Sequence, residues 1–230
     1  MSKVLAVGDI HTKQWIIFEV AKLIDDYDKI VFVGDYADDW GSGPLDTIRT
    51  WQTLRMFHAM YPEKVNLVIG NHDYIYLHRT SSISSGYNRA TQLLLDSPEN
   101  RSLKQWMYDI PVKVEIDGIT FSHAGFNTEW DDNETDFWRD DSPIWIRPDS
   151  IPYGWSFRDN QVFGHTPSTS CWEIPSGKNV WCIDTFSTYR DGTPIGDQTV
   201  LEIIDGKTFN KKSIKNENNS NTTSFEDKVS

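Results

Sequence analysis

Five short segments carry aspartate, histidine or asparagine beside glycine or serine, and these side chains bind divalent metal ions. The segments are GDIH (8–11), GDYAD (34–38), GNHD (70–73), SHAG (122–125) and GHT (164–166). Carboxylate, amide and imidazole donors suit Mn, Fe, Zn or Ni, and one shared carboxylate can hold two such ions roughly 3.5–4 Å apart. The set therefore predicts a two-metal hydrolase.

Each segment follows a run of apolar, often β-branched residues, which is typical of a strand that ends in a turn. Open α/β sheets bind ligands beyond the carboxyl ends of their strands, so segments that are distant in sequence can converge there. Taken singly, Asp9 or Asp35 could equally be a turn former or a helix cap, and His165 an ordinary loop histidine. Only the whole set indicates a metal site.

The residues between these segments predict the elements that position them. A strand at 3–7, an amphipathic helix at 13–26, a strand within KIVFVGDY (29–36), a second helix at 45–60 and a strand at 65–69 alternate along the first seventy residues. Such alternation is typical of βαβ units with right-handed crossovers.

Beyond residue 71 the pattern changes to short helices at 90–95 and 103–107, followed mainly by strands. The segment KVEIDGITFSH predicts a hairpin that turns at Asp117 and Gly118. A second hairpin is expected between 179–184 and 199–204. We therefore expect an α/β fold, a four-layer α-β-β-α sandwich of two mixed sheets flanked by helices.

The length of 230 residues suits one domain, which we place at 1–210, followed by a polar tail at 211–230. The tail has too little apolar content to offset the entropy of ordering it, so we expect it to be disordered. No stretch approaches the roughly 20 apolar residues of a membrane span, and residue 3 already begins a strand with no signal-peptide core. A cytoplasmic protein with no membrane partner is expected.

The formal charge is −12, and this argues against long nucleic acids as partners, because their binding needs Lys and Arg to neutralise phosphates. Small phosphoesters and phosphoproteins remain open as substrates. Cys171 and Cys182 are expected to be free and buried rather than disulfide-bonded, since the chain shows no export signal.

The five segments, in this order and spacing, resemble the calcineurin-like metallophosphoesterases, and most closely the bacterial and phage PPP-type Ser/Thr protein phosphatases and the symmetrical diadenosine tetraphosphatases. The resemblance covers about residues 4–204. SPIWIRP (142–148) is similar to the Trp-x-Arg phosphate-binding element of these enzymes, and WCIDT (181–185) to one of their late strands.

The resemblance implies two divalent metal ions, with Mn²⁺ first and Fe, Zn or Ni as alternatives. One ion would be bound by Asp9 and His11, and Asp35 would bridge both. The second ion would be completed by Asn71, His123 and His165.

The resemblance also implies that His72 is a general acid toward the leaving oxygen, oriented by Asp38. An imidazole beside a carboxylate stays protonated nearer neutral pH, which suits this role. The alternative is a histidine that only hydrogen-bonds. Arg147, together with the Asn71 amide, would bind the substrate phosphate, because a planar guanidinium matches its oxygens; the alternative is a surface arginine beside Trp145.

Two positions depart from the family pattern. Asp39 stands where PPP phosphatases carry a phosphate-binding arginine, so either Asp39 turns away, another arginine compensates, or the substrate differs. The candidates for compensation are Arg49, Arg55 and Arg79. Asp73 stands where glutamate is common, and this shorter carboxylate is expected to be tolerated.

The function expected from the residues and the resemblance is metal-dependent hydrolysis of phosphomonoesters, either phosphoserine and phosphothreonine in proteins or small phosphate esters. Attack would come directly from a hydroxide that bridges the two metals.

The alternative is a dinucleoside polyphosphate hydrolase or phosphodiesterase, in which some of the tryptophans at 130, 138, 145, 155 and 172 could stack on a nucleobase instead of packing internally. A non-catalytic scaffold is the third possibility, and the complete set of ligands argues against it.

Overall fold

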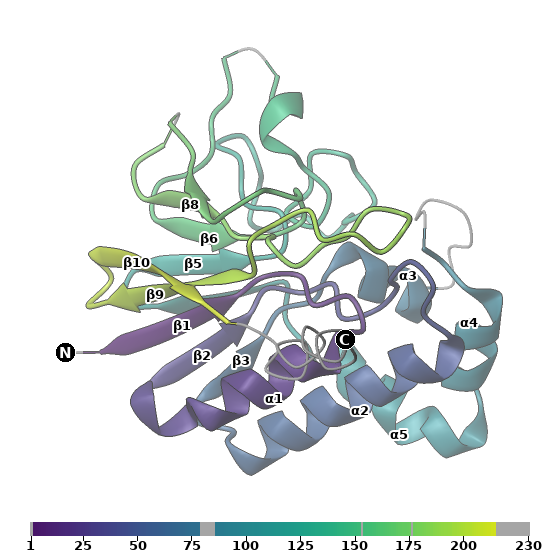
Figure 1. Cartoon of the computed structure of the whole chain (residues 1–230). Helices are drawn as coiled ribbons and strands as arrows, with labels where there is room; N and C mark the ends of the chain where they lie inside the picture. The colour runs from purple at the N-terminus through teal and green to yellow at the C-terminus, as the bar shows by residue number, and fades with distance from the viewer. Residues whose placement is uncertain (1, 79–85, 153, 176, 215–230) are drawn as a thin grey trace, which may run out of the picture.

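The structure is a computed structural model, and it describes residues 2–78, 86–152, 154–175 and 177–214. Two five-stranded mixed sheets face each other, and helices cover the outer side of the first sheet (Figure 1). The expected α/β class with two mixed sheets flanked by helices is confirmed. Over the second sheet, Figure 1 shows long connections and one short helical turn, the 3₁₀ helix η3 (Pro148–Ser150).

The first sheet joins the beginning and the end of the described chain. Its strands, in sheet order, are β10 (Thr208–Ser213), β9 (Thr199–Ile204), β1 (Lys3–Val7), β2 (Lys29–Phe32) and β3 (Val65–Leu67). Strands β1, β2 and β3 are parallel, whereas β9 runs antiparallel to both β1 and β10. The expected βαβ alternation is therefore confirmed.

The helices follow the first three strands. They are α1 (Gln14–Lys22), η1 (Ile24–Asp26), α2 (Pro44–Met60), α3 (Asn71–His78), α4 (Arg89–Leu95), η2 (Pro98–Asn100) and α5 (Arg101–Tyr108). The start of α2 is encoded locally, because Pro44 needs no N–H partner in the first turn and Asp46 accepts a hydrogen bond from the Gly43 N–H at 2.9 Å. None of the described helices is long and apolar enough to cross a membrane.

The second sheet has the order β4 (Lys113–Ile116), β5 (Ile119–Ser122), β6 (Gln161–Phe163), β8 (Val180–Cys182) and β7 (Trp172–Glu173). Strands β5, β6 and β8 are parallel, and the edge strands β4 and β7 run antiparallel to their neighbours. The β4–β5 hairpin turns at Asp117 and Gly118 as predicted.

The side chains of β1 alternate between two hydrophobic cores. Leu5 and Val7 pack against the helices, whereas Val4 and Ala6 pack against the second sheet. A strand that is buried on both faces reads as a continuous apolar run, which is how β1 appears in the sequence. Since the second core joins the two sheets face to face, strand ends from both sheets meet at one edge.

The predicted hairpin between 179–184 and 199–204 is wrong. Strand β8 belongs to the second sheet and β9 to the first, so the chain crosses between the sheets from Ile183 to Gln198. Both strands are short apolar runs separated by a turn-rich segment, and such a pattern does not specify which strand each one pairs with.

The domain boundary predicted at residue 210 is also too early. Strand β10 continues through Lys211 to Ser213 in register with β9, and Ile214 is buried. The remainder of the predicted tail, 215–230, lies outside the described residues. Cys171 and Cys182 are free and buried, as expected.

Candidate metal centre and active site

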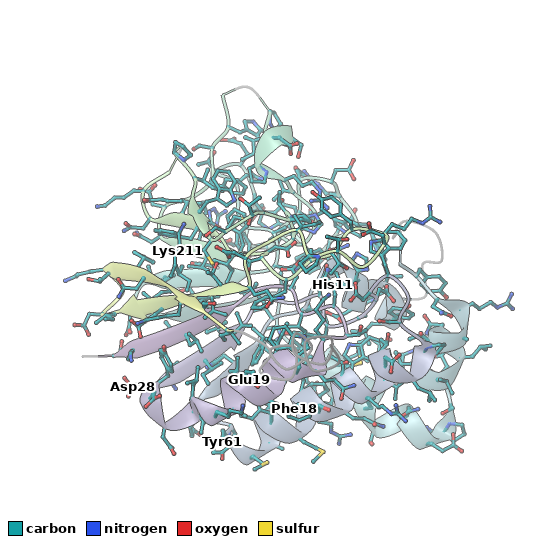
Figure 2. All side chains as sticks on the ribbon, viewed as in Figure 1. His11, Phe18, Glu19, Asp28, Tyr61 and Lys211 are labelled. Carbon is teal, nitrogen blue, oxygen red and sulfur yellow. The ribbon has the colours of Figure 1, made fainter. Side chains whose placement is uncertain are left out.

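The candidate ligands come from the carboxyl ends of strands in both sheets. Asp9 follows β1, Asp35 follows β2 and Asn71 follows β3, while His123 and His165 follow β5 and β6. Figure 2 labels His11 beyond the end of β1, where loops from the two sheets meet. The structure thus brings all the predicted metal ligands to one edge of the sandwich.

The backbone at this edge adopts conformations that are unusual for non-glycine residues. Positive φ values occur at His11 (39°), Asp35 (50°), Asp38 (56°) and His165 (63°). Each such residue costs about 1–3 kcal/mol and persists only where its surroundings hold it, and such residues cluster at functional sites. The Asp35 loop also packs so closely against Gly70 that a side chain does not fit there, because a Cβ atom at Gly70 would overlap the Asp35 carboxylate.

Two groups of potential ligands share Asp35. Asp9, His11 and Asp35 form one group, and Asp35, His123 and His165 form the other, with the ligand atoms of each group within 4.8 Å of one another. Asp35 Oδ1 lies 3.3 Å from His123 Nε2, and Asp35 Oδ2 lies 3.8 Å from His11 Nε2. One carboxylate oxygen therefore faces each group, which is the arrangement a bridging ligand requires.

Backbone carbonyls orient all three imidazoles. The pairs are His11 Nδ1 with Asp38 O at 2.7 Å, His123 Nδ1 with Val33 O at 2.9 Å, and His165 Nε2 with Trp145 O at 2.9 Å. Because a carbonyl can only accept, each ring donates its N–H there and turns its other nitrogen, which carries a lone pair, toward the carboxylates. Metal-binding histidines are held in this way.

Several acceptor atoms converge on His123 Nε2. Asn71 Oδ1 lies 2.8 Å from it, His165 Nδ1 lies 3.2 Å from it and Asp35 Oδ1 lies 3.3 Å from it. Burial and the neighbouring His123 hold the pKa of His165 well below its usual range, so this ring is neutral. Lone pairs that face one another at these distances are stabilised by a cation, so the donor set fits a divalent metal.

Buried negative charge supports the same conclusion. Asp9, Asp35 and Asp184 are each at most 2% exposed. Burial raises the pKa of Asp9 well above its usual value, and the charges of Asp184 and Asp35 raise it further. Divalent cations reverse this penalty, because they favour the ionised form of each carboxylate.

Asp184 is a site residue for which no role was predicted, although its segment WCIDT was noted. Its carboxylate accepts hydrogen bonds from the Ser187 N–H (3.3 Å) and hydroxyl (3.0 Å). It also lines a cavity that His72, His165 and Arg147 line as well, here called the central cavity. Trp40 lines the same cavity and was not singled out either. Both positions carried a local signal, because Asp184 follows strand β8 within WCIDT, and Trp40 directly follows Asp38 and Asp39, which line the same cavity.

His72 and Asp38 form the predicted pair. The Nδ1 atom of His72 lies 3.1 Å from Asp38 Oδ2, and the His72 N–H donates to Asp35 Oδ1 at 2.9 Å. Burial lowers the pKa of the His72 imidazole, but the carboxylates of Asp35 and Asp38 outweigh burial and raise it to about 9. Cations bound to Asp35 would offset the share of this pKa increase that comes from Asp35. The share that comes from the hydrogen bond to Asp38 would remain.

The central cavity has a volume of about 160 Å³. Its walls include Asp35, His72, His165 and Arg147. Arg147 donates from Nη1 to the carbonyl of His165 at 2.8 Å, which fixes its guanidinium beside the candidate metal ligands. The remaining donors of a guanidinium suit a tetrahedral oxyanion.

Asp39 also lines this cavity, and its charge is compensated by a lysine. Lys13 Nζ lies 2.7 Å from Asp39 Oδ2, and the Thr188 hydroxyl donates to Asp39 Oδ1 at 2.7 Å. Arg49 and Arg55 lie on α2 and are not among the residues that line the cavity; Arg79 lies outside the described residues. One alternative from the sequence was that an arginine compensates for Asp39. Among the described residues, the side chain that pairs with the Asp39 carboxylate is Lys13 instead.

Asp73 holds the loop that follows β2 and carries Asp35. It accepts hydrogen bonds from the Tyr36 N–H (3.1 Å), the Ala37 N–H (3.1 Å) and Trp51 Nε1 (2.9 Å). Burial and the charge of Asp35 raise its pKa to about 7. The shorter carboxylate therefore reaches the loop that carries Asp35.

Comparison with known proteins agrees with this geometry. Residues 2–200 match the family described as calcineurin-like phosphoesterase. The symmetrical bis(5'-nucleosyl)-tetraphosphatase of Methylobacillus flagellatus is 30% identical over 133 residues, which cover 54% of this chain and 44% of the relative. The corresponding protein of Vibrio cholerae serotype O1 is 28% identical over 133 residues, or 54% and 45% of the two chains. The chain thus matches less than half the length of these curated relatives.

Solved structures show the same fold. A cold-active protein-tyrosine phosphatase from a psychrophilic Shewanella superposes with a TM-score of 0.62 at 15% identity, covering 92% of this chain and 80% of that one. A protein serine/threonine phosphatase from Saccharomyces cerevisiae gives a TM-score of 0.58 at 14% identity, covering 94% and 81%. With the family match spanning most of its length, the chain belongs to the calcineurin-like phosphoesterases.

Proposed function

We propose that this phosphoesterase hydrolyses phosphomonoesters, either phosphoserine and phosphothreonine in proteins or small phosphate esters. The observation that carries the proposal is the pair of ligand groups that share Asp35 directly beside the His72–Asp38 pair. His11, Asp35 and His165 from the two ligand groups line one cavity together with the His72–Asp38 pair and Arg147. Groups that could bind and cleave a phosphoester are therefore close together.

Asp9, His11 and Asp35 would hold one divalent ion, and Asp35, Asn71, His123 and His165 would hold the second. We propose Mn²⁺, although Fe, Zn and Ni suit the same donors. When bound, such ions lower the pKa of water toward neutrality, supply a hydroxide for direct attack on phosphorus and offset the charge of the phosphoryl oxygens.

The protein's own groups would act on the other side of the phosphorus atom. With Nδ1 held by Asp38, His72 presents Nε2 to the cavity and can protonate the leaving oxygen. Arg147 and the Asn71 amide would bind the equatorial oxygens, where charge develops during phosphoryl transfer.

Symmetrical cleavage of a dinucleoside tetraphosphate is the second candidate. The similarity to tetraphosphatases in two bacteria favours it. The exposed ring of Trp40 at the cavity also favours it, because an indole can stack on a nucleobase.

The first test is hydrolysis by metal-stripped protein with and without Mn²⁺. The substrates are p-nitrophenyl phosphate, bis-p-nitrophenyl phosphate and diadenosine tetraphosphate, assayed in parallel. We expect no turnover without metal, and fastest turnover of the monoester once metal is restored. Fastest turnover of the diester or the dinucleotide would favour the second candidate, and no turnover with both metal sites filled would contradict the proposed activity.

Removing the Lys13 side-chain charge should weaken substrate binding. In Lys13→Met the Asp39 carboxylate would face the phosphate dianion without its partner, and the loss of ~1 kcal/mol of compensation should raise KM roughly threefold to tenfold with little change in kcat. Lys22→Met is the matched control, since Lys22 pairs with Glu19 on the surface of α1. An unchanged KM in Lys13→Met would show that Asp39 does not act on the substrate.

A further inference from the structure

We propose that Tyr76 is a positioning residue for the general acid. Its hydroxyl holds one oxygen of Asp38, so that the other oxygen orients His72. The inference rests on the role proposed for His72, and it extends that role to a residue outside the five motifs.

Three hydrogen bonds lead from the interior to the cavity. The Asn88 N–H donates to the Tyr76 oxygen at 2.8 Å, and the Tyr76 hydroxyl donates to Asp38 Oδ1 at 2.6 Å. Asp38 Oδ2 then lies 3.1 Å from His72 Nδ1. This series of hydrogen bonds ends at the His72 ring, which lines the cavity proposed to bind substrate.

The direction of each bond follows from the number of protons. A backbone N–H can only donate, so the Tyr76 oxygen accepts from Asn88, and its single proton is directed to Asp38. Asp38 Oδ1 is thereby engaged, and Oδ2 is the oxygen presented to His72. His72 must donate its Nδ1 proton there, which places Nε2 toward the cavity.

Helical spacing brings the two partners of Asp38 together. His72 and Tyr76 are four residues apart on α3, so they lie on the same face one turn apart. The Tyr76 ring is fully buried between Trp51, at 5.4 Å in an edge-on contact, and Tyr87, stacked at 5.2 Å. The hydroxyl is therefore held on a rigid ring.

Asp38 makes hydrogen bonds to two candidate site residues, His11 through its backbone carbonyl and His72 through its side chain. Its φ of 56° places it in the left-handed region, and its carbonyl accepts a hydrogen bond from His11 Nδ1 at 2.7 Å. The backbone of Asp38 thus orients a candidate metal ligand, while its side chain orients the candidate acid. Tyr76 fixes the side chain independently of the backbone.

The test is Tyr76→Phe, which keeps the packed ring and removes only the hydroxyl. The kcat values for phenyl phosphate and p-nitrophenyl phosphate are compared in Mn²⁺-loaded protein. Phenolate is a poor leaving group and needs the proton, whereas nitrophenolate leaves readily without it. We expect kcat for phenyl phosphate to fall at least about tenfold and that for p-nitrophenyl phosphate less than about threefold, since misplaced general acids lose part of their 10²–10⁴-fold effect. Metal content should not change.

Tyr27→Phe is the matched control. The buried Tyr27 hydroxyl also donates to a carboxylate, Glu202 Oε2 at 3.0 Å, but it lies just before β2, at the end of the sheet opposite the ligands. This variant should keep the wild-type ratio of the two rates. In a His72→Asn background, Tyr76→Phe should cause no further selective loss, because the two residues act as one unit.

Gly86→Ala gives a second route to the same result if Tyr76→Phe fails to fold. A Cβ atom at Gly86 would lie 2.6 Å from Asp38 Cβ, so the Asp38 side chain must shift while Tyr76 is untouched. The same selective loss with phenyl phosphate is expected.

The outcomes separate the two proposals. Equal losses with both esters, loss of metal, or an unchanged ratio in Tyr76→Phe would overturn the role of Tyr76 alone. If the wild-type protein hydrolyses neither ester with both metal sites filled, the proposed function fails and this inference fails with it.

Discussion

Replacing Asp35 with asparagine is expected to reduce kcat/KM for p-nitrophenyl phosphate at least about a thousandfold, because a bridging carboxylate is the ligand that a two-metal site can least replace. The two Asp35 oxygens face different ligand groups, so the change removes charge from both. Metal analysis of the purified variant should find clearly less than the wild-type metal content.

Asp46→Asn is the control for this variant. It makes the same chemical change at the first turn of α2, where Asp46 caps the Gly43 N–H away from the ligands. Wild-type activity and metal content are expected. Full metal content in Asp35→Asn would show that Asp35 does not bridge the metals.

His72→Asn should lower kcat for phenyl phosphate by about 10²–10⁴-fold, the usual contribution of a general acid. Metal content should stay near that of the wild type, because the hydrogen bond from His72 to Asp35 comes from the backbone N–H, which the substitution keeps, whereas the ring atom Nε2 lies 3.9 Å from Asp35 Oδ2. Kinetics and metal analysis on the same preparation test both statements.

His58→Asn provides the comparison for His72→Asn. His58 lies on α2 beside Trp106, with its ring 6.4 Å from the indole and outside the central cavity. It should behave as the wild type. Loss of metal in His72→Asn would instead identify His72 as a ligand and remove it from the role of acid.

Much of the fold could be predicted because it is encoded over short distances. The buried runs that form β1 and β2, the amphipathic helix α1 and the Asp117–Gly118 turn each depend on neighbouring residues. The pairing of β8 and β9 could not be predicted, because it depends on which sheet offers an edge, and local periodicity does not record that.

The candidate site divides in the same way. The types of its ligands and their positions after strands can be read along the chain, and the family resemblance proposes which ligand serves which ion. The compensation of Asp39 depends on Lys13 and on Thr188, which is 149 residues away in the sequence.

The strand–helix alternation, the donor atoms and their place at the ends of strands are encoded along the chain. Packing of the folded chain, in contrast, turns one Asp35 oxygen to each ligand group, places carbonyls against the three imidazoles and brings Tyr76 to Asp38. Propensity and periodicity act between near neighbours, whereas these contacts arise only when two sheets pack face to face and bring distant loops together.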